Sequence, residues 1–106
     1  MTAETTIVVY GDNSNWFATH LYWQLSYYGH PDVRIMDGGR EYWIDYDYPT
    51  TTEPVDPPPV EYGRTLNPPT NPKLRAYREE VRDALDTETA FIDVRLPEEF
   101  RGDITK

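Results

Sequence analysis

The stretch IVVYGDNSNWFATHLYW, residues 7–23, decides how the N-terminal half of this chain folds. Its β-branched and apolar start predicts a buried parallel strand over Thr6–Tyr10. The polar turn Gly11–Asn15 follows, and an Asn or Ser side chain there can cap the next helix. Aromatic and apolar residues then recur at helical spacing. They predict a helix that is buried on more than one side and stops at Gly29.

The alternation of strand and helix continues beyond this stretch. Val33–Met36 is predicted to form a second short strand, Asp37–Gly39 a sharp turn, and Arg40–Tyr46 a short helix. The order strand, helix, strand, helix predicts an α/β fold, with a parallel sheet flanked by helices.

Residues 48–72 have a different composition, because eight of the ten prolines lie between Pro49 and Pro72. This segment predicts an extended or polyproline linker. Pro57–Pro59 suits an SH3-type or WW-type groove, but a stiff connector is the favoured interpretation. Two modest halves, residues 1–47 and 73–106, are then left to build one core between them.

The C-terminal half has its own pattern. Apolar residues at helical spacing predict a helix over Lys73–Asp86, with the charged residues on the outer face. Ala90–Val94 is predicted to form a third strand, and Pro97–Phe100 to begin a helical turn with proline at an early position.

Charge and composition exclude several functions. The 106-residue chain has a net charge of −9, which argues against nucleic-acid binding. Only two lysines stand against eight arginines, a surface typical of proteins from a high-salt cytoplasm, with ordinary acidic variation as the alternative. With no cysteine and two histidines, we expect no disulfide, no thiolate, no metal site and no cofactor.

The sequence carries no targeting signal that we recognise. No run approaches the roughly 18 apolar residues of a membrane span, and the N-terminus lacks the basic and apolar regions of a signal peptide. A cytoplasmic protein without a membrane partner is therefore expected.

The loop at the end of the first predicted strand is a candidate ligand site. It consists of Gly11, Asp12, Asn13, Ser14 and Asn15. Backbone N–H groups between a strand end and a helix start can hold an anion. Because the Asp12 carboxylate opposes an anion there, a capped turn is favoured over a live anion site.

Two further features have competing interpretations. Asp93 and Arg95 flank Val94, where a charge-assisted pair fixing a loop is favoured over direct catalysis. Nine Tyr and three Trp would suit a carbohydrate or peptide binder, but their spacing favours core packing.

Two motifs bring the chain close to a known family. IVVYGDNSNWFATHLYWQLSYYGHPDVRIMDGGREYW, residues 7–43, resembles the second half of a rhodanese (thiosulfate sulfurtransferase) domain, and AFIDVRLPEEFRG, residues 90–102, resembles the start of one. Their order resembles the junction of a tandem two-domain rhodanese. By this resemblance residues 1–47 end a non-catalytic first domain, residues 48–72 form the linker and residues 73–106 begin the second domain.

The resemblance implies a sulfane sulfur transfer from thiosulfate to a thiophilic acceptor such as cyanide. Where an active domain has its cysteine, this chain has Gly11 and Asp12. The loop is therefore expected to be an inactive remnant, Asp93 and Arg95 would be active-site support residues, and the chain alone should not transfer sulfur. The front of the first domain would precede Met1, and the catalytic loop would follow Lys106.

The alternative function is a non-enzymatic rhodanese-like module that binds a protein partner or a small anion such as thiosulfate. Because the two domains would be homologous, the two halves can also dock as one hybrid domain or form a homodimer by domain swapping. A linker of 25 residues, at about 3 Å per residue, permits either arrangement.

Overall fold

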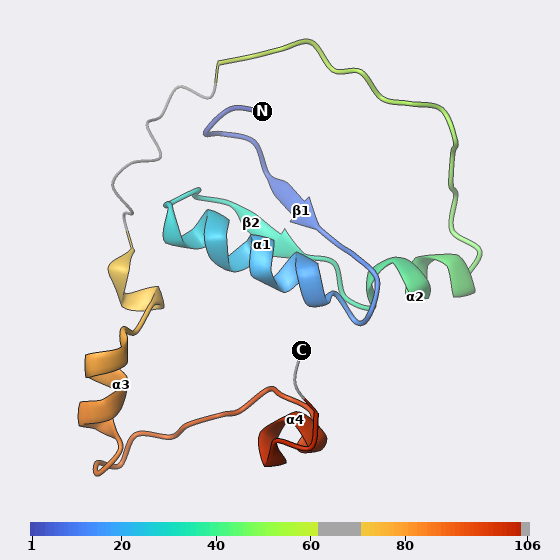
Figure 1. Ribbon diagram of the computed structural model, residues 1–106. Coiled ribbons are helices and arrows are strands. Elements are labelled where there is room, and N and C mark those ends of the chain that lie inside the picture. Colours follow the sequence, from blue (N-terminus) through green and yellow to red (C-terminus); the bar gives the residue numbers. More distant parts are fainter. Residues whose placement is uncertain (62–70, 105–106) are drawn as a thin grey trace. The chain divides into compact units, whose positions relative to one another are not determined.

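The computed structural model describes residues 1–61 and 71–104. The chain divides into two compact units, Met1–Arg75 and Ala76–Lys106, and each is described by itself. The first unit contains the elements β1 (Ile7–Val9), α1 (Trp16–Tyr27), β2 (Val33–Ile35), α2 (Gly39–Asp45) and the short 3-10 helix η1 (Pro72–Leu74). The second contains α3 (Arg78–Ala84) and α4 (Pro97–Arg101), as Figure 1 shows.

The sheet of the first unit is a parallel pair, in which Ile7 lies opposite Val33. Both strands are shorter than predicted. Backbone hydrogen bonds continue at the ends of the pair, where the Ile7 N–H donates to the Asp32 carbonyl at 2.9 Å and the Met36 N–H donates to the Val9 carbonyl at 3.0 Å. Parallel neighbours need a crossover, which α1 provides. The predicted α/β class, with a parallel sheet flanked by helices, is confirmed.

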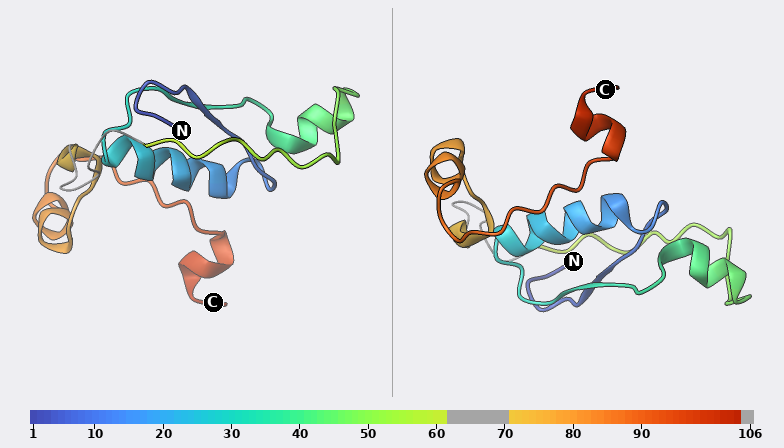
Figure 2. Two further views of the ribbon diagram at one scale, coloured as in Figure 1. Left: turned by 90° about the horizontal axis from the view of Figure 1, so that it is seen from above. Right: turned by 90° about the horizontal axis from the view of Figure 1, so that it is seen from below.

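Helix α1 packs against both strands, and Figure 2 shows it from two further sides. Three apolar or aromatic side chains are buried, namely Val9, Ala18 and Tyr27. The prediction that α1 is buried on more than one side is wrong, since Trp16 and Phe17 are 60% and 76% exposed. A sheet of two strands covers only one face of a helix, so the first turn of α1 stays exposed on its other side at Trp16 and Phe17.

The C-terminus of α1 ends as predicted. Gly29 has a φ of 80°, a conformation that glycine adopts without steric cost. Its N–H donates to the Ser26 carbonyl at 3.1 Å, and the His30 N–H donates to the Leu25 carbonyl at 2.9 Å. These two bonds form a Schellman motif. The chain then turns into β2, with the His30 ring buried and 2.8 Å from the Thr5 carbonyl oxygen.

Residues 49–61 contain no helix or strand and are exposed. Residues 62–70 of the predicted linker lie outside the described residues, so the linker stays a prediction. In the described ranges, no helix has the length and apolar character needed to cross a bilayer.

The predicted single helix over Lys73–Asp86 is wrong. The backbone is extended at Arg75, with φ −139° and ψ 128°, so η1 and α3 are separate. A new helix starts after Tyr77 because the Glu80 carboxylate accepts the Tyr77 N–H at 2.8 Å, which satisfies a free donor at the helix start.

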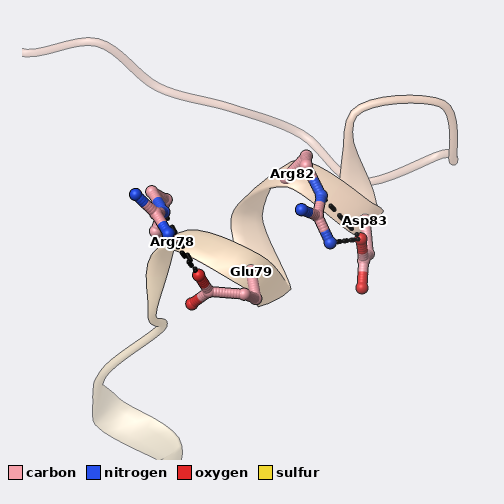
Figure 3. A network of polar contacts seen from close by, with 4 residues as sticks. All are labelled: Arg78, Glu79, Arg82 and Asp83. Carbon is pink, nitrogen blue, oxygen red and sulfur yellow. Dashed lines mark hydrogen bonds and ion pairs between the residues drawn. The ribbon is translucent and has the colours of Figure 1, made fainter.

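The charged face of α3 is solvated, as predicted. Figure 3 shows its two ion pairs, each between neighbours in the sequence, with distances of 2.8 Å for Arg78–Glu79 and 3.0 Å for Arg82–Asp83. The Arg78 hydrogen bond lowers the pKa of Glu79. Water screens exposed pairs of this kind, so they contribute little to stability.

The predicted third strand over Ala90–Val94 is also wrong for the described residues. A strand needs a neighbour to accept and donate its ladder bonds, and the sheet here consists of β1 and β2 alone. Ile92 and Val94 are accordingly 87% and 93% exposed. Helix α4 does begin at Pro97, in the early position that was predicted.

Candidate functional site

The loop between β1 and α1 has an unusual backbone. Asn13, Ser14 and Asn15 have φ values of 49°, 54° and 66°, so three consecutive residues adopt the left-handed conformation. Asparagine tolerates this region better than most residues. Asn15 occupies the position that precedes α1, yet its side chain makes no capping hydrogen bond. The prediction that the side chain of Asn13, Ser14 or Asn15 caps this helix is therefore wrong, because Asn15 holds the cap position and no side chain makes the capping bond.

The Asn15 side chain instead ties the two strand ends together. Its Oδ1 accepts the Gly11 N–H at 2.9 Å, and its Nδ2 donates to the Met36 carbonyl at 2.8 Å. Only 7% of Asn15 is exposed, so these polar groups would be costly to leave unpaired. Both ends of the amide are satisfied by backbone, one from each strand-to-helix turn. The loop is thus locked to the start of α2.

Gly39 makes this close approach possible. It has a φ of 62°, and a Cβ there would lie 2.8 Å from Asn15 Oδ1 and 2.9 Å from the Gly11 carbonyl oxygen. The following N–H, from Arg40, donates to the same Gly11 carbonyl at 3.1 Å. Any side chain at position 39 would push α2 away from the loop.

Arg40 and Asp12 close the outer side of the loop. Arg40 Nη1 lies 3.1 Å from Asp12 Oδ1, and both side chains are more than half exposed. Beside them is an open hollow of about 220 Å³, lined by Asp12, Asn13, Arg40, Glu41, Ile44 and Asp45. Three carboxylates face one guanidinium, which is already paired. The charge of this hollow therefore opposes a small anion such as thiosulfate.

The loop retains part of an anion-binding arrangement. Within residues 1–61 and 71–104, the backbone N–H groups of Asp12, Asn13 and Ser14 have no hydrogen-bond acceptor. Such donors ahead of a helix can contact an anion. The chain has no cysteine to supply the nucleophilic sulfur, so the loop cannot form a persulfide.

Asp93 and Arg95 form a pair in the second unit. Arg95 Nη2 lies 2.6 Å from Asp93 Oδ2, and the Arg95 N–H donates to Asp93 Oδ1 at 2.9 Å. The Arg95 guanidinium lowers the pKa of Asp93 to about 2, and it lies 5.4 Å from the centre of the Phe100 ring. The pair fixes the turn into α4. Its role as active-site support remains a prediction.

Sequence reasoning missed three residues that shape the first loop, namely Met36, Gly39 and Arg40. A signal for them was present. The carboxyl ends of adjacent parallel strands lie at one edge of the sheet, so the turn after β2 must meet the turn after β1. The predicted turn Asp37–Gly39 and Arg40, the first residue of the next predicted helix, were therefore candidates for contacts with the loop that follows β1.

Comparisons with known proteins agree with this architecture. Residues 1–46 match the rhodanese-like domain family. The chain is 50% identical over 103 residues to the "Putative thiosulfate sulfurtransferase" of Haloferax volcanii, which aligns 95% of this chain with 34% of that protein. It is 42% identical over 106 residues to the "Sulfur carrier protein TtuD" of Thermus thermophilus, and this alignment covers 96% of this chain and 36% of that protein.

A third relative is the "Putative thiosulfate sulfurtransferase 1" of Mycobacterium bovis, which is 44% identical over 101 residues. This alignment covers 95% of this chain and 35% of that protein. The chain thus spans about a third of the length of the curated relatives it matches. These alignments extend through the proline-rich segment and the second unit, beyond the match to the domain family. Taken with the parallel β1–α1–β2 unit, they show that this chain belongs to the rhodanese family.

Proposed function

We propose that this chain is the central part of a two-domain sulfurtransferase that moves sulfane sulfur from thiosulfate to a thiophilic acceptor such as cyanide. Residues 1–47 would end a non-catalytic first domain, residues 48–72 would connect the domains, and residues 73–106 would begin the second. The catalytic cysteine would lie outside residues 1–106. Asp93 and Arg95 would then support the active site of the second domain.

The observation that carries the proposal is the extent of the alignments. Relatives named as thiosulfate sulfurtransferases align with about 95% of this chain, across the linker, and are about three times as long. A match confined to residues 1–46 would support a rhodanese-like domain and nothing further. The continuous alignment supports one piece of a longer protein of that kind.

The chemistry of the loop supports a non-catalytic role for the first domain. Transfer of sulfane sulfur through the enzyme needs a thiolate that attacks the outer sulfur of thiosulfate, with sulfite as the leaving group. Position 11 is glycine and position 12 is an aspartate paired with Arg40. The Asn15 amide, which joins Gly11 to Met36, gives the loop a structural task instead.

A second candidate function is a non-enzymatic module that binds an anion or a protein partner. The N–H groups of Asp12, Asn13 and Ser14 favour an anion at this loop, because they lack acceptors in the described residues. The carboxylates of Asp12, Glu41 and Asp45 oppose it. Titration with thiosulfate, followed by the amide NMR signals of residues 11–15, tests whether this loop binds an anion. We expect no saturable shift below about 10 mM.

An activity assay tests the non-catalytic assignment. The purified 106-residue chain should produce no thiocyanate from thiosulfate and cyanide above the buffer blank. A cysteine-containing sulfurtransferase, assayed in parallel, shows that the conditions support turnover. Thiocyanate formation that rises in proportion to the concentration of this chain would overturn the assignment.

A further inference from the structure

Helix α2 ends in a turn that fixes how the chain enters the proline-rich segment. The Asp47 N–H donates to the Ile44 carbonyl at 3.0 Å, and the Tyr48 N–H donates to the Trp43 carbonyl at 3.1 Å. These two bonds form a Schellman motif. Asp47 has a φ of 52°, the left-handed conformation that this motif requires just after the helix. The direction in which the chain leaves α2 is therefore set by the backbone.

The Trp43 side chain holds the residues that follow this turn. The centre of its ring lies 4.8 Å from the centre of the Tyr48 ring, with the planes inclined by 44°. Its indole Nε1–H donates to the Pro49 carbonyl at 3.0 Å. Trp43 thus contacts the start of the proline-rich segment through its own carbonyl, its ring and its indole N–H. Of these three contacts, the indole bond reaches furthest along the chain.

The indole of Trp43 and the carbonyl of Pro49 are matched as donor and acceptor. An indole N–H can only donate, and a proline has no N–H, so its carbonyl is its one backbone hydrogen-bonding group. The proline ring also fixes φ, so the segment loses less conformational freedom when it is held. Aromatic grooves use the same economy when they bind proline-rich peptides. Here the bound segment belongs to the same chain.

The held residues form one side of an open groove of about 1140 Å³. Pro49 and residues 50–53 line this groove together with Tyr10 and Met36, which directly follow β1 and β2. The groove therefore lies at the carboxyl ends of the two parallel strands, the edge at which open α/β sheets bind ligands. The Glu53 N–H donates to Thr51 Oγ1 at 3.0 Å, a local bond that shapes this side of the groove.

We propose that Trp43 fixes residues 48–53 on α2 as a strap, and that this strap is a preformed wall of the groove. The wall is in place before any ligand enters, so ligand binding does not have to supply the free energy of ordering it. The first residues of the predicted linker are then part of the folded first unit. Trp43 acts as a positioning residue, because it shapes the groove by holding the strap.

Backbone order parameters, measured by amide nitrogen NMR relaxation on the full chain, test the role of Trp43. The Trp43→Phe variant keeps an aromatic ring beside Tyr48 and loses the indole donor. Loss of one net hydrogen bond raises the ratio of released to held strap about fivefold. We expect the amides of residues 50–52 to have order parameters of about 0.85 in the wild type and to fall towards the flexible range, below about 0.6, in the variant.

Trp23→Phe is the matched control, because the Trp23 indole donates to a different segment, at the Leu74 carbonyl, over 2.7 Å. Its order parameters for residues 50–52 should equal those of the wild type. Flexible values in the wild type, equal values in the wild type and Trp43→Phe, or an equal fall in both variants would overturn the proposal.

The sheet supplies the folding control for these variants. Val8 and Arg34 lie opposite each other in the parallel pair, and their amide signals should keep the wild-type positions in Trp43→Phe. Loss of these signals would assign Trp43 to the stability of the whole unit, not to the strap, and would overturn the proposal as well.

Hydrogen exchange of the wild-type chain tests the strap without any variant. The Trp43 Nε1–H is bonded to the Pro49 carbonyl. It should therefore exchange at least about fivefold more slowly than the indole N–H of free tryptophan at the same pH and temperature. Exchange at the rate of free tryptophan would show that the strap is not held, and the proposal would fail.

Discussion

The two units of this chain are held together in different ways. In the first unit, side chains join residues that are far apart in the sequence. Asn15 bonds to Met36, Thr6 to Asp32 at 2.7 Å, and Trp23 to Leu74. In the described part of the second unit, the side-chain hydrogen bonds that we cite are local, such as Tyr77 with Glu80, Arg95 with Asp93, and Leu96 with Glu99.

This difference indicates that the first unit specifies its own tertiary structure, whereas the second specifies only local structure. Long-range bonds in the first unit fix the register of β1 and β2 and the position of α2. Local bonds in the second unit fix only turns and helix starts, while apolar residues such as Ile92 and Val94 stay exposed. We expect the first unit to unfold cooperatively and the second to lose its turns independently, and the following changes test that contrast.

Gly39→Ala should have the largest effect. The new Cβ would meet Asn15 Oδ1 and the Gly11 carbonyl, at a φ of 62°. We expect a loss of about 3 kcal/mol in the free energy of unfolding of the first unit. Urea unfolding followed by tryptophan fluorescence measures it, since all three tryptophans lie in that unit.

Gly102→Ala is the matched control in the second unit. Gly102 also has a positive φ, 79°, but a Cβ there would have no atom within 4 Å. The cost should be about 1 kcal/mol, from the backbone alone, and should be confined to α4, so the fluorescence midpoint of the first unit should stay at its wild-type value. Equal losses in the two variants would show that packing around the first loop contributes nothing.

Asn15→Ala should destabilise the first unit by about 2 kcal/mol, since it leaves the Gly11 N–H without its acceptor and removes one of the two donors to the Met36 carbonyl, which also accepts the Gly39 N–H at 3.3 Å. The same fluorescence measurement applies. Thr87→Ala removes an exposed bond to the Ala84 carbonyl in the second unit, where surface substitutions change stability by less than about 0.5 kcal/mol, and it should leave the fluorescence midpoint of the first unit unchanged. An unchanged urea midpoint for Asn15→Ala would contradict the locking role of this side chain.

Salt should stabilise the chain by a smaller amount. A net charge of −9 produces self-repulsion that ions screen. We expect the melting temperature to rise by about 5 °C between 0.1 M and 2 M KCl. Equal melting temperatures at both concentrations would remove the link between this composition and a high-salt environment.

Acid should have the smallest effect on stability, by weakening the turn at Asp93. Arg95 lowers the pKa of this carboxyl to about 2 in the folded chain, below its unfolded value of about 3.9. Its stabilising contribution is therefore complete above about pH 4 and is lost as the pH falls towards 2. A carboxyl carbon NMR titration of Asp93 measures it. An Asp93 midpoint near 4 would contradict the pairing.

The sequence predicted the first unit well because its signals are local and strong. β-branched residues mark β1, and Gly29 marks the end of α1. The strand predicted at Ala90–Val94 also rests on a run of mostly apolar residues. A pattern identifies residues suited to burial but does not supply the neighbouring strand, so this prediction failed.

The helix predicted over Lys73–Asp86 failed for a related reason. Helical spacing continues through Tyr77, but the Glu80 carboxylate starts a new helix there. In the candidate site, an asparagine before a helix can cap that helix, or its side-chain amide can hydrogen-bond to the backbone of two separate turns. The bridge forms at Asn15 because Gly39 brings the Met36 carbonyl within reach, and the sequence alone does not give that distance.

The central claim is that these residues are part of a longer sulfurtransferase whose catalytic cysteine lies elsewhere. The intact mass of the native protein in its source cells tests it most directly. We predict a polypeptide well above twice the 12.4 kDa of this chain. A native mass near 12.4 kDa would contradict it, and binding without catalysis would then become the leading function.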